Sequence, residues 1–468
     1  MNECTFIILG ATGDLTKRKL IPAIYWLVKD KKIDKFAIIG VANSKSNINQ
    51  ILSESKKFIK KVDGRVWRSI EASCYYQQFD FYKPQDFLNL KDVISIVEKK
   101  HKLSGNRLFY LATWPQHFEV ITKNLVKSGI VEKYENQKQK KVGWSRIVYE
   151  KPFGYDLKSA RKINQAILKL FNENQIYRID HYLGKELVGN IELVRFTNRV
   201  FEPLWCNKHI DSIQIILSEN ICVEGRGKSY DSCGAINDVV QGHMLQIMAL
   251  VGMEAPKMLS GKYIRDAKEK VLEKVIVDDV LLAQYEGYLK EKGVAHKSKT
   301  ETFGAVKLYI DNRRWHGVPF YLKTGKCLDK KEIGIHIRFK MVKCLLNQSC
   351  PSDSNYLTIK IQPDEGFFLE LNTKVPGKNE VTPVKMDFCH TCLFGQNTPK
   401  AYEVLLEDVI RGDQSYFLRS DEILESWRIV EKIKKLAKNK KLYSYKKGSS
   451  GPVELEKFDK AKKLRWRG

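Results

Sequence analysis

An apolar run that ends at a glycine near the N-terminus limits the folds available to this chain. Residues 5–9 are β-branched or large and apolar, which is typical of a buried strand, and Gly10 follows directly. From Asp14 onward, apolar residues recur at helical spacing. A second apolar run at 36–40 lies where the next strand of a β-α-β unit belongs. The order strand, tight turn, helix and strand predicts a parallel sheet.

The length of the chain and its later apolar runs predict two domains. At 468 residues, the chain exceeds what one hydrophobic core usually serves. Runs at 108–112 and 146–149 complete an α/β domain over residues 1–177, a Rossmann-like doubly wound parallel sheet. Beyond it we expect a larger C-terminal α+β domain over residues 178–468, built on a mainly antiparallel sheet. Its strands are expected at 212–217, 306–310, 333–339 and 356–361.

Charge and hydropathy restrict the partners that we expect. The formal net charge is +26, which raises the possibility of nucleic-acid binding. The lysines, however, are spread along the whole chain, and no helix-turn-helix, zinc-finger or aromatic RNA-binding motif accompanies them. No apolar run has the length of a bilayer span, and no basic leader precedes the first strand. We therefore expect a cytoplasmic protein that binds neither nucleic acid nor membrane.

The cysteine pattern gives no sign of a disulfide framework or a metal site. Ten cysteines are scattered without paired spacing, so reduced thiols are expected. Cys389 and Cys392 have the spacing of half a zinc site or of a redox pair. Because no second pair of this kind exists in the chain, we expect no metal.

The segment 178–186 combines a carboxylate, an imidazole, a phenol and an ammonium group. If the chain turns as a helix after Asp180, His181 and Lys185 lie four residues apart on one face and offer one anion two donors. The alternative is an amphipathic helix start with solvated charges. The mixture of side chains predicts a phosphate site.

The glycine turn after the first strand suits a dinucleotide. Such a turn lets backbone N–H groups at the start of a helix face a pyrophosphate, although the G-x-x-G spacing here differs from the usual G-x-G-x-x-G. The turn residues expected to contact the dinucleotide are Gly10, Ala11, Thr12, Gly13, Asp14 and Leu15. After the second strand, Asn43, Ser44 and Lys45 include no carboxylate that would repel a 2′-phosphate. We expect NADP, with NAD as the alternative.

Several further motifs occur in a fixed order along the chain. They are Arg18-Lys19-Leu20, Glu150-Lys151-Pro152-Phe153-Gly154, Glu224-Gly225-Arg226-Gly227, Asp238-Val239-Val240-Gln241-Gly242-His243, and Gly317-Val318-Pro319-Phe320 leading to Thr324-Gly325-Lys326. Together with the glycine turn and segment 178–186, they make the chain resemble the glucose-6-phosphate dehydrogenases from Phe6 to Arg467.

The resemblance implies an activity. Such enzymes oxidise C1 of D-glucose 6-phosphate to 6-phospho-D-glucono-1,5-lactone, with hydride transfer to NADP, as the first step of the oxidative pentose phosphate pathway, and form homodimers or homotetramers. Two alternatives stay open. One is another sugar oxidoreductase, since some share the Glu-Lys-Pro triplet. The other is a basic nucleic-acid-binding protein on a retired enzyme scaffold.

Removal of the C1 hydroxyl proton requires a base, and a histidine suits that role. Among nine histidines, His243 is set apart by its polar neighbours and by the resemblance. Asp238 is five residues away, which on an α-helix amounts to about 140°. The carboxylate that orients the imidazole must then come from elsewhere, and the resemblance implies Asp180.

The resemblance also implies the remaining contacts. The residues implied for glucose 6-phosphate are Lys151, His181, Tyr182, Lys185, Glu219, Asp238, Lys326, Lys331 and Gln362. Those implied for the dinucleotide, besides the glycine turn, are Lys19, Asn43, Ser44, Lys45, Ala112 and Lys151. The family usually has arginine where this chain has Asn43, which leaves the strictness of the NADP preference open.

Overall fold

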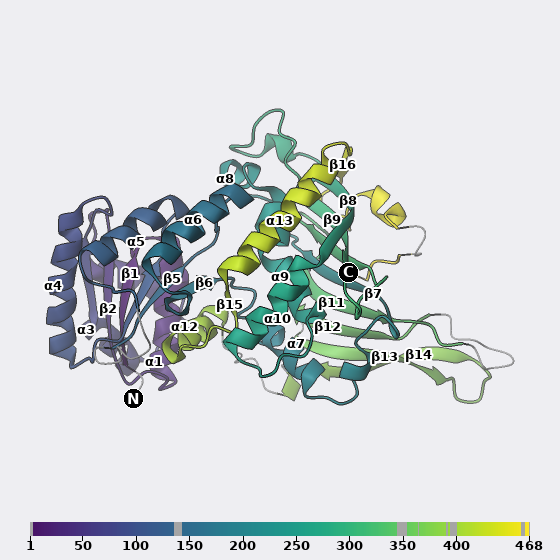
Figure 1. Ribbon diagram of the computed structural model, residues 1–468, viewed down its shortest axis with the longest axis horizontal. Coiled ribbons are helices and arrows are strands. Elements are labelled where there is room, and N and C mark those ends of the chain that lie inside the picture. Colours follow the sequence, from purple (N-terminus) through teal and green to yellow (C-terminus); the bar gives the residue numbers. More distant parts are fainter. Residues whose placement is uncertain are drawn as a thin grey trace. The chain divides into compact units, whose positions relative to one another are not determined.

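The chain divides into two compact units. The structure is a computed structural model that describes residues 3–134, 143–343, 353–363, 365–389, 392–393, 400–459 and 464–467 (Figure 1). Unit 1 comprises Met1–Gly184, Met258–Arg265 and Pro399–Leu424, and unit 2 comprises Lys185–Lys257, Asp266–Thr398 and Glu425–Gly468. The first division between the units falls after Gly184, and two later segments return to unit 1. The domain boundary expected between residues 177 and 178 stays a proposal.

Unit 1 contains the predicted parallel sheet. Within the described ranges its strand order is β15-β6-β5-β4-β1-β2-β3. The strands are β1 (Glu3–Leu9), β2 (Lys35–Ala42), β3 (Cys74–Gln78), β4 (Arg107–Leu111), β5 (Ser145–Tyr149), β6 (Ile176–Ile179) and β15 (Phe417–Leu418). Every pairing is parallel except that of β15 with β6 at the edge. The sequence prediction of a doubly wound sheet is confirmed.

Apolar side chains cover both faces of this sheet. Successive side chains of a strand point to opposite faces, so Phe6 and Ile8 of β1 pack in one cluster with helix residues, while Ile7 is buried on the other side. The helices of unit 1 are a π-helical turn (Thr16–Leu20), α1 (Ile21–Lys29), α2 (Ile48–Lys56), α3 (Gly64–Ala72), α4 (Pro84–His101), α5 (Phe118–Lys127), α6 (Leu157–Leu170) and α12 (Ala401–Arg411). Figure 1 shows them around the sheet.

Helix α12 is remote in sequence but is fixed to unit 1 by an arginine. Arg146 of β5 donates from Nη1 to the carbonyl oxygens of Val409 (2.5 Å) and Ile410 (2.7 Å). The last carbonyls of a helix have no partner within the helix and form its negative end. The guanidinium therefore satisfies two of them, and Leu405 of the same helix joins the apolar cluster of β1 and α1.

Unit 2 is built on a mainly antiparallel sheet, as predicted. In the part of the chain that the structure describes, the order is β14-β13-β12-β11-β7-β10-β9-β8-β16, and only the β10–β7 and β16–β8 pairings are parallel. The strands are β7 (Ile210–Ser218), β8 (Val275–Tyr285), β9 (Phe303–Ile310), β10 (Phe320–Gly325), β11 (Glu332–Phe339), β12 (Tyr356–Gln362), β13 (Gly366–Lys374), β14 (Val381–Cys389) and β16 (Leu442–Tyr445).

Helices pack on this sheet and connect the two units along the chain. Helix α7 (Glu186–Phe196) packs on β12, and a π-helix (Ile236–Met244) packs on β7 and β10. The other helices of this region are α8 (Gly227–Asp231), α9 (Leu245–Gly252), α10 (Gly261–Glu273) and α13 (Ser420–Ala437), and the last two cross from one unit to the other. No described helix has both the length and the apolar character of a bilayer span.

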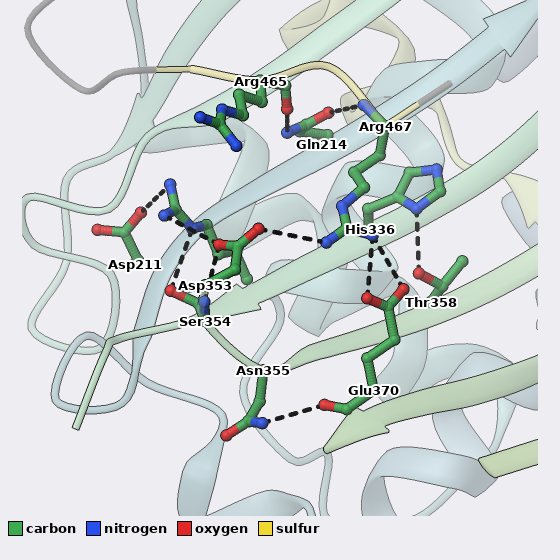
Figure 2. A network of polar contacts seen from close by, with 11 residues as sticks. Asp211, Gln214, His336, Asp353, Ser354, Asn355, Thr358, Glu370, Arg465 and Arg467 are labelled. Atoms are coloured by element: carbon green, nitrogen blue, oxygen red, sulfur yellow. Dashed lines mark hydrogen bonds and ion pairs between the residues drawn. The ribbon is translucent and has the colours of Figure 1, made fainter. Parts of the chain in front are cut away.

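The C-terminal residues are anchored to the sheet of unit 2 by a polar network (Figure 2). Gln214 of β7 donates to the carbonyl of Arg465 (2.8 Å) and accepts from the backbone N–H of Arg467 (3.1 Å). The Arg467 guanidinium contacts both carboxylate oxygens of Glu370 (2.9 and 3.0 Å) and lies 3.7 Å from Asp353. This network fixes the described end of the chain in place.

The expectation of reduced thiols is wrong for two pairs of cysteines. Cys222 is bonded to Cys327, and Cys389 to Cys392. The first pair lies 105 residues apart, so no local spacing could reveal it. Both sulfurs of the Cys389–Cys392 pattern are taken by this bond.

We expect the replacement Arg467→Ala to lower the free energy of unfolding by about 1–3 kcal/mol, because it leaves the Glu370 carboxylate without its cation. Thermal unfolding measured by calorimetry tests this. Lys378→Ala serves as the control, because its exposed ammonium is 4.0 Å from Glu380 and such a pair contributes little. Equal melting temperatures for the two variants would contradict the anchoring role of Arg467.

Candidate functional site

The turn after β1 requires glycine at its first position. Gly10 has φ +103°, and a Cβ there would collide with the backbone of Ala112 at the end of β4. The turn is closed by hydrogen bonds from Gly10 N–H to Val41 (2.8 Å) and from Gly13 N–H to Gly10 (3.0 Å). The predicted strand, turn and helix are confirmed.

Two predicted dinucleotide residues meet where the strand order reverses. Strands β2 and β4 lie on either side of β1, and β1 leads to β2 while the later strands build outward from β4. In open parallel sheets the crevice at such a point binds ligands. Gly10 and Ala112 directly follow the two strands that border it. Lys19 lies in the helical turn that follows Gly10 and Gly13. Its pKa is lowered by burial and by the positive charges of Lys400 and Arg18.

The loop after β2 is held in place by hydroxyl groups. Ser44 Oγ lies 2.8 Å from Thr12 Oγ1, and the Ser44 carbonyl accepts from the Tyr76 hydroxyl at 2.5 Å. Gln78 donates to the carbonyl of Asn43 at 3.0 Å. These contacts place Ser44 beside the glycine turn and leave the Lys45 side chain exposed. The residues predicted for the adenosine end of a dinucleotide are thus brought together.

A buried carboxylate precedes Lys151. Glu150 directly follows β5 and accepts from the hydroxyls of Tyr110 (2.5 Å) and Tyr402 (3.1 Å). Burial raises the pKa of Glu150, and the two tyrosine hydrogen bonds oppose this shift. The bond from Lys151 to Pro152 is cis. Sequence reasoning missed Tyr402, because it comes from α12 and no local pattern links it to the Glu-Lys-Pro motif.

The segment 178–186 does not form the helix that the sequence predicted. Asp180 is buried, and its carboxylate accepts from the backbone N–H of Tyr182 at 2.9 Å, which closes a turn. Helix α7 begins only at Glu186, so the expected i, i+4 pairing of His181 with Lys185 is wrong. The Asp180 carbonyl also accepts from the Leu183 N–H at 3.1 Å, so the chain closes a tight turn here and does not continue as a helix.

Arg178 of the same segment has a structural position. Its side chain is fully buried, and Nη1 contacts the Glu173 carboxylate at 2.5 Å and the Leu418 carbonyl at 3.4 Å. Arg178 therefore joins β6 to β15, the strand that the chain adds to unit 1 from far downstream.

Lys185, which directly precedes α7 in unit 2, is influenced by a second lysine, Lys331. The pKa of Lys185 is lowered to about 8, mainly by burial and also by the positive charge of Lys331, while the Glu365 carboxylate opposes the shift. Gln362, at the end of β12, pairs with Ile333 of β11, the strand that begins directly after Lys331. The sequence-predicted residues Lys185, Lys331 and Gln362 are thus neighbours in one part of unit 2. A partly buried ammonium beside a second lysine is suited to binding an anion.

A lysine–carboxylate pair lies at the parallel ends of β7 and β10. Gly325 is paired with Ser218, so the residues that follow, Lys326 and Glu219, lie beside each other, and their charged groups form an ion pair. Lys326 is 4% exposed. Two predicted substrate residues that are remote in sequence are therefore in direct contact.

His243 and Asp238 lie on a π-helix, which changes the geometry expected from the sequence. A π-helix closes its hydrogen bonds between residues five apart, so side chains at that spacing fall near one another. The separation of about 140° applies to an α-helix and does not describe this pair, and the choice of Asp180 over Asp238 as the partner of His243 stays a prediction. His243 is 2% exposed.

Comparison with known proteins gives a consistent result over the whole chain. Residues 7–190 match the model of the glucose-6-phosphate dehydrogenase NAD binding domain, and residues 192–467 that of the C-terminal domain of the same family.

Individual relatives agree. A glucose-6-phosphate 1-dehydrogenase of Bacillus subtilis is 40% identical over 99% of this chain and 98% of its own, and one of Chlamydia muridarum is 40% identical over 91% and 89%. A solved structure of glucose-6-phosphate dehydrogenase in complex with glucose 6-phosphate is 33% identical, covers 99% of this chain and 98% of its own, and has a TM-score of 0.91.

Proposed function

This chain belongs to the glucose-6-phosphate dehydrogenase family, and we propose here which of its residues carry out the family's reaction. The protein is an oxidoreductase that oxidises C1 of D-glucose 6-phosphate to 6-phospho-D-glucono-1,5-lactone, with hydride transfer to a nicotinamide dinucleotide. The match of both halves to the family models carries this conclusion and argues against the two alternatives, another sugar oxidoreductase and a retired scaffold. Formation of the reduced dinucleotide from glucose 6-phosphate is its direct test.

We propose His243 as the base. Loss of hydride from C1 leaves a developing carbonyl, and the hydroxyl proton must be taken up as this happens. A buried imidazole on a helix that also carries Asp238 supports this role. The dinucleotide supplies the hydride acceptor. Asp180 is proposed as the carboxylate that orients the imidazole and stabilises it when charged. This pairing rests on the family resemblance.

We propose two groups of substrate contacts. Lys185 and Lys331 supply positive charge for the phosphate, and the lowered pKa of Lys185 supports this because a bound dianion restores the charged form. The Lys326–Glu219 pair presents a donor and an acceptor to sugar hydroxyls. The residues proposed from the family alone are Lys151, His181, Tyr182, Asp238 and Gln362.

Oligomeric state and location are also proposals. The family resemblance suggests a homodimer or homotetramer. Two Arabidopsis thaliana relatives, each 38% identical, are named cytoplasmic, which supports the same location for this chain.

We propose NADP as the preferred dinucleotide, with NAD as the alternative. Ser44, beside Thr12, and the exposed Lys45 offer a hydroxyl and a cation to the 2′-phosphate, and no carboxylate stands among residues 43–47. Ser44→Asp should lower kcat/KM for NADP more than tenfold, because the new carboxylate repels the 2′-phosphate, and should leave kcat/KM for NAD nearly unchanged. A tenfold change corresponds to roughly 1.4 kcal/mol. Ser46→Asp is the matched control. Equal kcat/KM with NADP and NAD in the unaltered protein would remove the preference.

His243→Asn should abolish turnover and leave the affinity for glucose 6-phosphate nearly intact, because only the transition state requires the proton acceptor. Steady-state turnover and equilibrium binding of glucose 6-phosphate measure the two effects separately. The control is His209→Asn, which changes an exposed histidine in the same unit. A His243→Asn variant that keeps more than a few per cent of the turnover would exclude this residue as the base.

The KM for glucose 6-phosphate should rise with pH above about 8. Below its pKa of about 8 the Lys185 side chain is charged and attracts the phosphate, and above it the charge is lost. We expect a rise approaching tenfold per pH unit between about pH 8 and about pH 9.5. Lys185→Arg, whose guanidinium stays charged, should remove this slope, and Lys185→Ala should raise KM throughout. A slope that persists in Lys185→Arg assigns the titration to another group.

A further inference from the structure

The ammonium of Lys326 is held by an aromatic ring as well as by a carboxylate. Its Nζ lies 5.2 Å from the centroid of the Tyr230 ring, besides forming the ion pair with Glu219. At this distance the negative face of the ring attracts a cation, and the attraction grows where water is excluded. Lys326 and Tyr230 are 4% and 5% exposed, so water is largely excluded here.

The Tyr230 hydroxyl has no part in this arrangement. It is buried and forms no hydrogen bond with the residues that the structure describes. A buried hydroxyl without a partner costs free energy, so hydrogen bonding does not account for a tyrosine at this position. What the side chain offers is the face of its ring, directed at Lys326.

The Tyr230 ring is held in place by its neighbours. Tyr230 belongs to an apolar cluster with Tyr288, and the two rings meet edge to face at 6.3 Å. The next residue, Asp231, accepts from the Tyr288 hydroxyl (2.8 Å) and the Ala295 N–H (3.2 Å), and its carbonyl accepts from the Thr300 hydroxyl (2.7 Å). The short helix α8 that carries Tyr230 is thereby tied to the segment before β9.

The backbone of Lys326 is fixed as well. Its N–H donates to the Thr302 carbonyl (3.0 Å), and its carbonyl accepts from the Tyr445 hydroxyl (2.6 Å). Cys327, the next residue, is bonded to Cys222. With the backbone held, the position of the ammonium depends on the conformation of the long side chain, and a lysine side chain that is ordered only on binding costs affinity.

We propose that Tyr230 is a positioning residue that holds the Lys326 ammonium, through the face of its ring, in the orientation that meets the sugar. The inference rests on the proposed role of Lys326 in binding glucose 6-phosphate. Tyr230 itself does not touch the substrate. Because the ammonium is oriented before the substrate arrives, less conformational entropy is lost on binding. The effect of Tyr230 therefore falls on KM and not on kcat.

Steady-state kinetics of ring variants tests this. Tyr230→Leu should raise the KM for glucose 6-phosphate about fivefold to tenfold, with kcat and the KM for the dinucleotide within about twofold of the unaltered protein. Tyr230→Phe restores the ring face without the hydroxyl and should restore KM. The control is Phe303→Leu, the same kind of change in the same apolar cluster, at a residue that pairs with Gly325 and whose ring faces no cation among the described residues.

A double-mutant cycle separates the proposed substrate role of Lys326 from the positioning role of Tyr230. If Lys326→Met raises KM and Tyr230→Leu adds nothing further in that background, the two residues act as one unit. Full additivity of the two changes overturns the proposal, as does an equal rise in KM for Tyr230→Phe or Phe303→Leu. If Lys326→Met leaves KM unchanged, the substrate role of Lys326 is wrong and the inference is overturned with it. If Lys326→Met raises KM and Tyr230→Leu does not, only the inference is overturned.

A second series keeps the packing of the core. Phenylalanines with increasing numbers of ring fluorines at position 230 preserve the volume of the ring but withdraw electron density from its face. KM should rise stepwise with each fluorine. A KM that is the same for all members of the series overturns the proposal, even if the Tyr230→Leu variant is too unstable to measure.

Discussion

The close approach of two strand ends at Gly10 is the constraint on which unit 1 depends. A side chain there would meet the Ala112 backbone, and the positive φ of Gly10 turns the chain from β1 into its helix. The turn brings backbone donors to the edge where β1 and β4 separate, and it places Thr12 beside Ser44. Any change at Gly10 therefore acts on the sheet and on the helix together.

Unit 2 organises its side chains by a different means. The parallel pairing of β10 with β7 brings Lys326 beside Glu219, and the π-helix brings residues five apart into proximity. The Tyr230 ring and the Glu219 carboxylate then hold the ammonium of Lys326, and the Thr302 carbonyl and the Tyr445 hydroxyl hold its backbone. Much of the precision of this region comes from buried neighbours such as Tyr230 and Tyr445, which do not belong to any of the sequence motifs that mark the family.

The sequence predicted the positions of the strands along the chain better than it predicted which of the two units each element belongs to. Apolar runs marked the strands at 5–9, 36–40, 212–217 and 333–339, because a buried strand needs a continuous or alternating apolar pattern. The same reasoning could not assign α12 to unit 1. That assignment depends on the Arg146 guanidinium reaching the end of a helix more than two hundred positions downstream, and no local pattern encodes such a contact.

By itself the sequence determined the residue types of the site, the glycine turn and the family, because these are properties of short motifs in a fixed order. Only the tertiary structure decided the geometry. The Asp180 side chain closes a turn where the sequence suggested a helix, and a π-helix replaces the α-helix expected around His243. Both outcomes depend on which donors and acceptors packing leaves available, and local propensity carries no information about that.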